Sequence, residues 1–321
     1  MTKLSDLIPL NLEEEKAKFF ASNFTYNPQF IYQKNTPTKK LEKYGKPKWW
    51  YLFLAHKILR KYLKNKNQIT STELSKNFIE AAELEKILKK RLAVYELENS
   101  YQIIFSKNFV SRIAVNNSDG LIKISLPVTI EKEEVEHIIN HEIDTHVVRQ
   151  LNYEQQPWFK KKKKNKFKKY LTTEEGLAAI NELLLSKHQL AYKSAINYLA
   201  VNLALKKDFA SVFKFFYDIS GDLERSWTWT LKKKRGLRDT GQKGAFTKDL
   251  VYFEGFVKVL NYLRKNNYDP SKLYYGKIDL QDIKKAEKIG VTKKLILPQI
   301  FSENPQAYKE SIKQIIQNNF L

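Results

Sequence analysis

The chain has 321 residues, 42% of them hydrophobic and 13% aromatic, so it can bury a substantial core and is not mainly disordered. It contains no cysteine, which excludes disulfides and thiolate metal sites. Lysine and arginine outnumber aspartate and glutamate by 57 to 35, a formal net charge of +22. Such an excess favours anionic partners, although a general drift toward lysine in the composition would also produce it.

The first part of the chain mixes proline, asparagine and lysine. We interpret residues 1–45 as an N-terminal arm and residues 46–321 as one metallopeptidase-like domain. The first residues lack a charged-then-apolar leader, and the longest apolar run, Trp49 to Ala55, is too short to span a bilayer. We therefore expect a cytoplasmic protein without a transmembrane segment.

Helical periodicity begins at Trp49 and predicts one helix, followed by a second that ends near Leu92. Thr72 and Glu73 supply a start signal for the second helix. The period then changes to two, which is typical of short strands. The predicted strands are Tyr101–Phe105, Ser111–Val115 and Leu121–Leu126. We expect an α+β, mainly helical fold with a small antiparallel sheet at about residues 101–126.

A helical stripe over about residues 132–152 carries the hexapeptide His141-Glu142-Ile143-Asp144-Thr145-His146. Imidazole and carboxylate groups are typical zinc ligands, and a glutamate beside the first histidine is the water-activating base of HExxH metallopeptidases. Here the spacing is one residue longer, so a regular helix would point the two rings about 140° apart. A π-bulge would bring both rings to one face, and Asp144 and Thr145 suit such a widened turn because they are mediocre helix formers. The alternative is a regular helix with two unrelated histidines.

A second pair of histidines, His137 and His141, has the regular same-face spacing of four residues. The inverted zinc motif HxxEH would require a glutamate where Asn140 stands, so this pair has no base. We interpret His137 as a partner or surface residue.

A hydrolytic zinc site needs a third protein ligand. Glu174 and Glu175 are candidates, because they open the next predicted helix, at about residues 172–187. Thr172 and Glu175 also fit a capping box, in which the glutamate only bonds the start of its own helix. The residues alone leave this choice open.

The segment Lys160–Tyr170 contains eight lysines among its eleven residues, a density that resists burial and predicts a mobile loop. Its position between the two helices places it at the rim of the proposed site, where it could attract acidic peptides or be inert. Nearby aromatic residues could stack bases of a nucleic acid: Trp158, Phe159, Phe167 and Tyr170. No nucleic-acid-binding motif accompanies them, so nucleic-acid binding through Lys160–Lys169 is the less favoured interpretation.

The sequence HEIDTHVVR followed by TEEGLA resembles the bacterial QEGLA-motif proteins and their relatives, the tubulin tyrosine carboxypeptidases. These proteins are zinc metallopeptidases with an HExxxH helix and a downstream EGLA glutamate. The similarity continues in Arg235–Phe256 and in Leu273–Ile283, and so covers most of the chain. The lysine-rich segment between the two motifs is a departure from the family pattern.

The resemblance implies a zinc-metallopeptidase fold with a zinc ion as cofactor. Its residues imply His141, His146 and Glu175 as the zinc ligands and Glu142 as the general base. It also implies a carboxypeptidase that removes a C-terminal tyrosine or phenylalanine from peptides or proteins. An acidic substrate tail is suggested separately by the excess of lysine.

The glycine-rich stretch before residue 250 contains Arg235, Arg238 and Lys248. An exopeptidase that acts at a C-terminus must neutralise a free carboxylate, which an arginine fork or a lysine can do. The alternative for each is a solvated basic loop residue. Tyr252 could stabilise the oxyanion of the transition state or could be a core residue.

Overall fold

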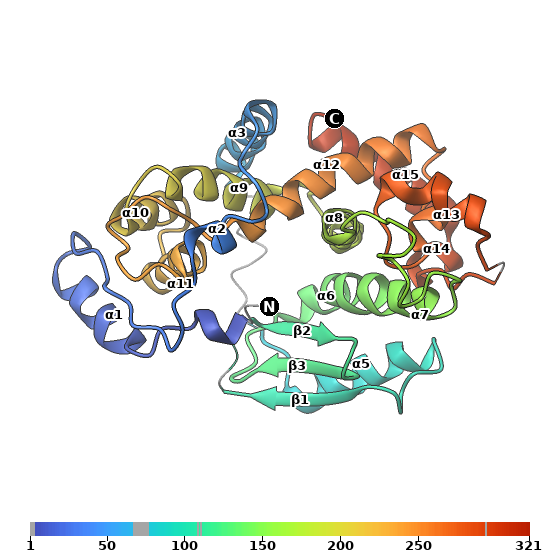
Figure 1. Ribbon diagram of the computed structural model, residues 1–321, viewed down its shortest axis with the longest axis horizontal. Coiled ribbons are helices and arrows are strands. Elements are labelled where there is room, and N and C mark those ends of the chain that lie inside the picture. Colours follow the sequence, from blue (N-terminus) through green and yellow to red (C-terminus); the bar gives the residue numbers. More distant parts are fainter. Residues whose placement is uncertain (1–3, 67–76, 108, 110, 293) are drawn as a thin grey trace. The chain divides into compact units, whose positions relative to one another are not determined.

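The computed structural model describes residues 4–66, 77–107, 109, 111–292 and 294–321 (Figure 1). The chain forms two compact units. Unit 1 comprises Met1–Lys64 and Tyr192–Phe253, and unit 2 comprises Asn65–Ala191 and Glu254–Leu321. Among the described residues, every helix is too short or too polar to cross a membrane.

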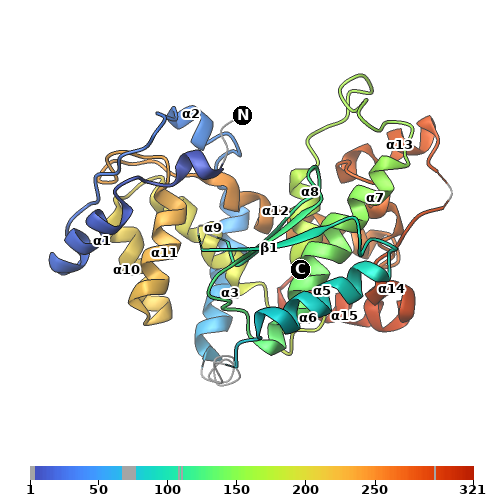
Figure 2. The same ribbon diagram turned by 90° about the horizontal axis from the view of Figure 1, so that it is seen from below.

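Unit 1 is built from helices. They are α1 (Leu12–Ala21), α2 (Thr38–Leu41), α3 (Trp49–Lys64), α9 (Tyr192–Ala204), α10 (Phe209–Ser220) and α11 (Leu223–Lys234). Helix α3 packs on α9, and α10 lies beside α11 in both ribbon views (Figure 2). Helix α3 confirms the helix predicted to begin at Trp49. An aromatic cluster forms the core of this unit: Phe19, Phe30, Tyr32, Phe209, Phe213 and Trp227.

Unit 2 contains the sheet and the remaining helices. They are α5 (Ala81–Ala93), β1 (Gln102–Ser106), β2 (Ile113–Asn116), β3 (Leu121–Ser125), α6 (Val135–His141), α7 (Val148–Glu154), α8 (Leu171–Leu183), α13 (Ile283–Ile289), α14 (Gln299–Glu303) and α15 (Pro305–Asn318). Helix α12 (Leu250–Lys265) contains the boundary between the units. The predicted start signal at Thr72 and Glu73 lies outside the described residues.

The sheet corrects one prediction. Its strand order is β1-β3-β2, with β3 antiparallel to β2 but parallel to β1, so it is mixed rather than antiparallel. The central strand β3 carries Ile122 and Ile124, which are both 0% exposed. Its place between β1 and β2 covers these two side chains on both sides. Alternation along a strand shows which side chains face the core but not which strands are neighbours or in which direction they run, so it could not reveal the parallel pairing of β1 with β3.

The helix that follows the sheet runs from α6 through a π-helical turn into α7, and in Figure 1 it lies along the β2 side of the sheet. Helix α8 packs on α6 and on the π-helical turn. On its other side, α8 meets α12 backbone to backbone at Gly176 and Gly255. A Cβ atom at Gly176 would lie 2.1 Å from the carbonyl carbon of Gly255, so only glycine permits this contact.

Candidate metal centre

The HExxxH segment contains the widened turn that its spacing requires. Glu142–Val147 is π-helical, which confirms the predicted bulge. The hydroxyl of Thr145 donates to the carbonyl of Asn140, five residues back, at 2.8 Å. Asp144 is fully buried and accepts a hydrogen bond from Arg91 at 2.7 Å. The two residues expected to suit the turn therefore hold it in place.

The turn brings three potential ligands together. The ligand atoms of His141, His146 and Glu175 lie within 4.8 Å of one another. The Nε2 atom of His146 is 3.7 Å from a carboxylate oxygen of Glu175, and the centroids of the two imidazole rings are 5.2 Å apart. Two imidazoles and one carboxylate are the donor set of many hydrolytic zinc sites, so these residues fit a zinc ion with one coordination position left for water.

Helix α8 begins in a way that excludes the capping box. Its N-cap residue is Tyr170, and no side chain caps the helix. Thr172 is therefore already inside the first turn. Glu175 is 5% exposed and faces His146.

Each of the two histidines bonds a carboxylate of α8 through its Nδ1 atom. The Nδ1 atom of His146 is 3.0 Å from Glu174 Oε1, and the Nδ1 atom of His141 is 3.0 Å from Glu182 Oε2. An ionised carboxylate only accepts hydrogen bonds, so each ring donates its Nδ1–H, and in the neutral ring Nε2 then carries a lone pair. Both lone pairs are then available to a metal.

The Glu174 carboxylate lies in a buried cluster of charges. It is 2.7 Å from Lys277 Nζ and 3.2 Å from an Arg149 nitrogen. Burial alone would raise the pKa of Glu174, but Lys277, His146 and Arg149 hold it well below the ordinary value. Burial would likewise lower the pKa of His141, whereas the carboxylates around it, that of Glu182 first, raise it to about 9.

Glu142, the predicted base, is adjacent to His141 in the same turn. One of its carboxylate oxygens accepts a hydrogen bond from the backbone N–H of Val115 at 3.3 Å. Val115 belongs to β2, an edge strand, so this N–H is not used within the sheet. The sheet therefore positions the carboxylate of Glu142.

Comparison with known proteins identifies the family of the chain. The family model described as "Microtubule-associated tyrosine carboxypeptidase" matches residues 38–317. The chain belongs to this family. It is 28% identical over 99% of its length to a putative tyrosine carboxypeptidase of Mus musculus, of which the match covers 62%. It is 27% identical over 98% of its length to microtubule-associated tyrosine carboxypeptidase 1 of Homo sapiens, of which the match covers 68%. The chain thus spans about two thirds of the length of these relatives.

In this member of the family, His137 is not part of the group of ligand atoms. Its Nδ1–H donates to the carbonyl of Glu182 at 2.8 Å, which joins α6 to the end of α8. His137 is thus a packing partner of α8.

The residues predicted to bind substrate lie in unit 1. Arg238 is exposed, and Tyr252 is half-buried. The guanidinium of Arg235 stacks on Phe246 with 4.4 Å between its carbon and the ring centroid. Arg235 Nε is buried without a hydrogen-bond partner among the described residues. Burial lowers the pKa of this group. Such a cation is suited to an anionic ligand.

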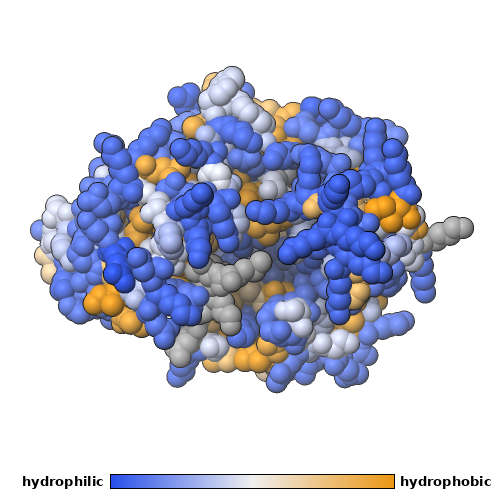
Figure 3. All heavy atoms as spheres, in the orientation of Figure 1, coloured by the Kyte–Doolittle hydropathy of each residue, from blue (hydrophilic) through white to orange (hydrophobic). Residues whose placement is uncertain are grey.

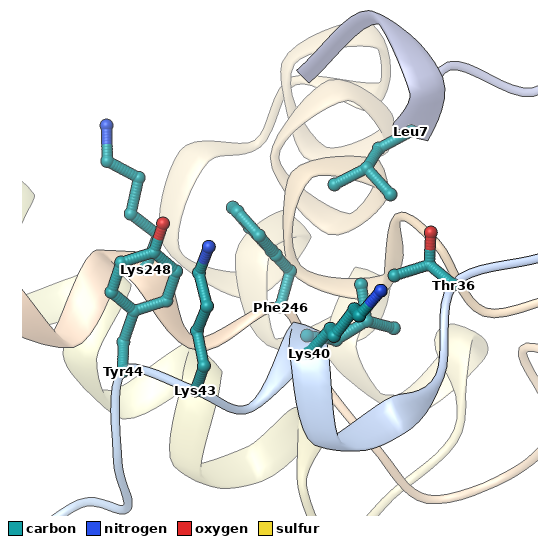
Figure 4. Close-up of a pocket in the computed structure, with 8 residues that line it drawn as sticks. Leu7, Thr36, Lys40, Lys43, Tyr44, Phe246 and Lys248 are labelled. Carbon is teal, nitrogen blue, oxygen red and sulfur yellow. The ribbon is translucent and has the colours of Figure 1, made fainter. Parts of the chain in front are cut away.

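A small pocket of about 90 Å³ lies in the same unit. Figure 4 shows Phe246 at its centre, with Lys43, Tyr44 and Lys248 pointing in one direction. The pocket thus combines an apolar floor with lysine side chains, a chemistry suited to a ligand that has both an apolar part and a negative charge.

The lysine-rich segment is a loop, as predicted, but part of it is packed. Trp158 is fully buried and cannot stack a base, which removes one support for nucleic-acid binding. Lys162 Nζ lies 4.4 Å and 4.0 Å from the ring centroids of Tyr153 and Tyr170, and desolvation lowers its pKa to about 8. Other lysines of the loop, among them Lys161, are exposed. The face of the molecule in Figure 3 is largely hydrophilic.

Sequence reasoning missed Glu182, Arg149 and Lys277. One signal was present for Glu182, since it follows Glu175 by seven residues and therefore lies on the same face of the helix. Lys277 belongs to the segment Leu273–Ile283 that carries part of the family resemblance, but nothing in its spacing connects it to the histidines.

Proposed function

We propose that this chain is a zinc-dependent carboxypeptidase that removes a C-terminal tyrosine or phenylalanine from a peptide or protein. The observation that carries the proposal is the convergence of His141, His146 and Glu175, with Glu142 on the same turn. Membership of a family described as tyrosine carboxypeptidases supports the choice of reaction and of terminal residue. Relatives from mouse and human bear the same description.

In the proposed reaction the two Nε2 atoms and the Glu175 carboxylate would hold the zinc ion. A bound zinc ion supplies Lewis acidity, which polarises a carbonyl and acidifies water. Glu142 removes a proton from the attacking water through its carboxylate oxygen and later transfers it to the leaving amine. The hydrogen bond from Val115 keeps one oxygen of Glu142 in a fixed orientation for both transfers.

The substrate must also present a free α-carboxylate. We propose Arg235 as its main partner, because it is a largely desolvated guanidinium with an unsatisfied Nε, and Lys248 as a second cation. Arg238, being exposed, is the weakest of the three proposed contacts. Tyr252 is proposed to stabilise the oxyanion through its hydroxyl.

The metal assignment is tested by zinc analysis of purified protein. We expect about one zinc per chain in the wild type, since three protein ligands form one site. His141→Ala should lose the metal, while His137→Ala should retain it, because His137 bonds a backbone carbonyl and lies outside the group of ligand atoms. Equal loss of zinc from both variants would show that the ligand assignment is wrong.

The chemical assignment is tested with Glu142→Gln, which keeps the size of the side chain but removes the base. The variant should bind zinc like the wild type, while kcat for release of tyrosine from a peptide falls by about 10²–10⁴-fold. Free tyrosine is measured by chromatography, and a peptide ending in alanine serves as the specificity control. Full activity of a zinc-loaded Glu142→Gln preparation would rule out Glu142 as the base.

A further inference from the structure

The site contains a second layer of charge behind His146. Glu174 precedes the proposed ligand Glu175 on α8 but faces the opposite nitrogen of the imidazole, Nδ1, at 3.0 Å. It is 5% exposed, and its two cationic partners, Arg149 and Lys277, are 0% and 6% exposed. This is a closed cluster, because every charged group in it meets a group of opposite charge.

The partners of Glu174 are themselves fixed. Arg149 donates to the carbonyls of Leu273, Gly276 and Ile278 at 2.8–3.0 Å, in addition to Glu174. These carbonyls lie in the segment that also carries Lys277. The segment approaches α7 closely, since a Cβ atom at Gly276 would lie 2.7 Å from the Cα of Tyr153. The position of Glu174 therefore depends on a stretch of chain about a hundred residues further on.

The second histidine is held differently. The side chain of Glu182, which accepts from His141, is 34% exposed, against 6% for that of Glu174. The carboxylate of Glu174 is thus the more desolvated of the two, and it cannot leave its two cationic partners without leaving buried charges unpaired.

We propose that Glu174 is a positioning residue, which fixes the tautomer and orientation of His146 so that Nε2 faces the metal, and that Lys277 and Arg149 hold Glu174 in place. This inference rests on the proposed zinc site but not on peptidase activity. Hydrogen-bond partners behind a metal-bound histidine commonly change metal affinity by about 10–100-fold when they are removed. Glu174 thus contributes to zinc binding without contacting the ion.

The experiment measures the zinc dissociation constant by competition with a chromophoric chelator. Glu174→Gln removes the negative charge but leaves Arg149 and Lys277 facing each other. The double variant Glu174→Gln/Lys277→Met restores the net charge of the cluster and still lacks the carboxylate. The control is Glu134→Gln, which removes the carboxylate of a more exposed ion pair with Arg112, just before the helix that carries His141.

In the metal-free form, the double variant should have an unfolding temperature close to that of the wild type. It should bind zinc about 10–100-fold more weakly than the wild type does. With cobalt in place of zinc, its visible absorption bands should shift, because a neutral amide holds the ring of His146 less firmly than a carboxylate does. Glu134→Gln should match the wild type in both measurements. If the double variant has the zinc affinity and the cobalt spectrum of the wild type, the inference is overturned. If the wild type binds no zinc, the proposed function is overturned instead.

Discussion

The glycine after the proposed third ligand allows a quantitative test of how the fold holds the site. In Gly176→Ala the new Cβ would lie 2.1 Å from the carbonyl carbon of Gly255, whereas ordinary contacts of a Cβ begin at 3.4 Å. The α8 and α12 backbones must therefore separate by about 1.3 Å at this point, the difference between these two distances. Because the backbone fixes the position of a Cβ atom and the carbonyl carbon belongs to the backbone of α12, no change of rotamer can relieve the contact.

The substitution has two opposing effects on stability. Alanine improves helix propensity over glycine by about 1 kcal/mol. Overpacking of a well-packed contact costs about 1–3 kcal/mol, and a clash between two backbones belongs at the upper end of that range. We therefore expect a net destabilisation of about 2 kcal/mol, measured by urea unfolding of the metal-free protein.

The same displacement should impair the site. Glu175 is adjacent to Gly176, and metal–ligand distances tolerate changes of only about 0.2 Å. Zinc affinity should therefore fall along with stability. Gly241→Ala is the control, since the tightest contact of its Cβ would be a side-chain oxygen of Asp239 at 3.1 Å and no backbone atom is close; it should change stability by less than about 0.5 kcal/mol. If Gly176→Ala is as stable as the wild type and binds zinc equally well, this contact does not position α8.

Two further predictions concern the substrate. Replacing the exposed lysines Lys161, Lys163 and Lys164 by glutamine should raise KM for an acidic peptide ending in tyrosine and leave kcat and zinc content unchanged. The effect should weaken at higher salt, because exposed charges are screened over about 8–10 Å; an equal response of a neutral peptide would contradict steering. Arg235→Ala should raise KM more than Arg238→Ala does for peptides with a free C-terminus. Unchanged KM in Arg235→Ala would exclude its contact with the carboxylate.

The convergence of His141, His146 and Glu175 could be predicted from the sequence because much of its geometry is local. The spacing of His141 and His146 required a widened turn, and Glu142–Val147 forms that turn as a π-helix. Helix α8 brings Glu175 to His146, as the family resemblance implied. Periodicity also identified the strands, but it could not reveal that β3 lies between β1 and β2, because the choice of neighbours depends on contacts elsewhere in the fold.

The charges behind the histidines were not accessible in this way. Arg149 and Lys277 meet at Glu174 although 128 residues separate them in the chain, and the hydrogen bonds of Arg149 are made to backbone carbonyls that no residue pattern encodes. In a sequence with 57 basic residues, a lysine that will be buried looks like any other lysine. A buried, paired lysine differs from an exposed one only in its place in the fold, which the sequence pattern does not show.

This distinction limits what the net charge of +22 can explain. Lys233 is paired with Asp249, and Lys234 donates to the carbonyls of Ala204 and Gln242 at 3.0 Å and 2.9 Å, so both charges point into unit 1. Lys277 is directed at Glu174 in the same way. None of these cations can meet a ligand at the surface, yet each is counted in the formal charge. Attraction of an acidic substrate must therefore come from exposed lysines, and a variant that changes only exposed lysines tests steering without disturbing the charges that hold the fold together.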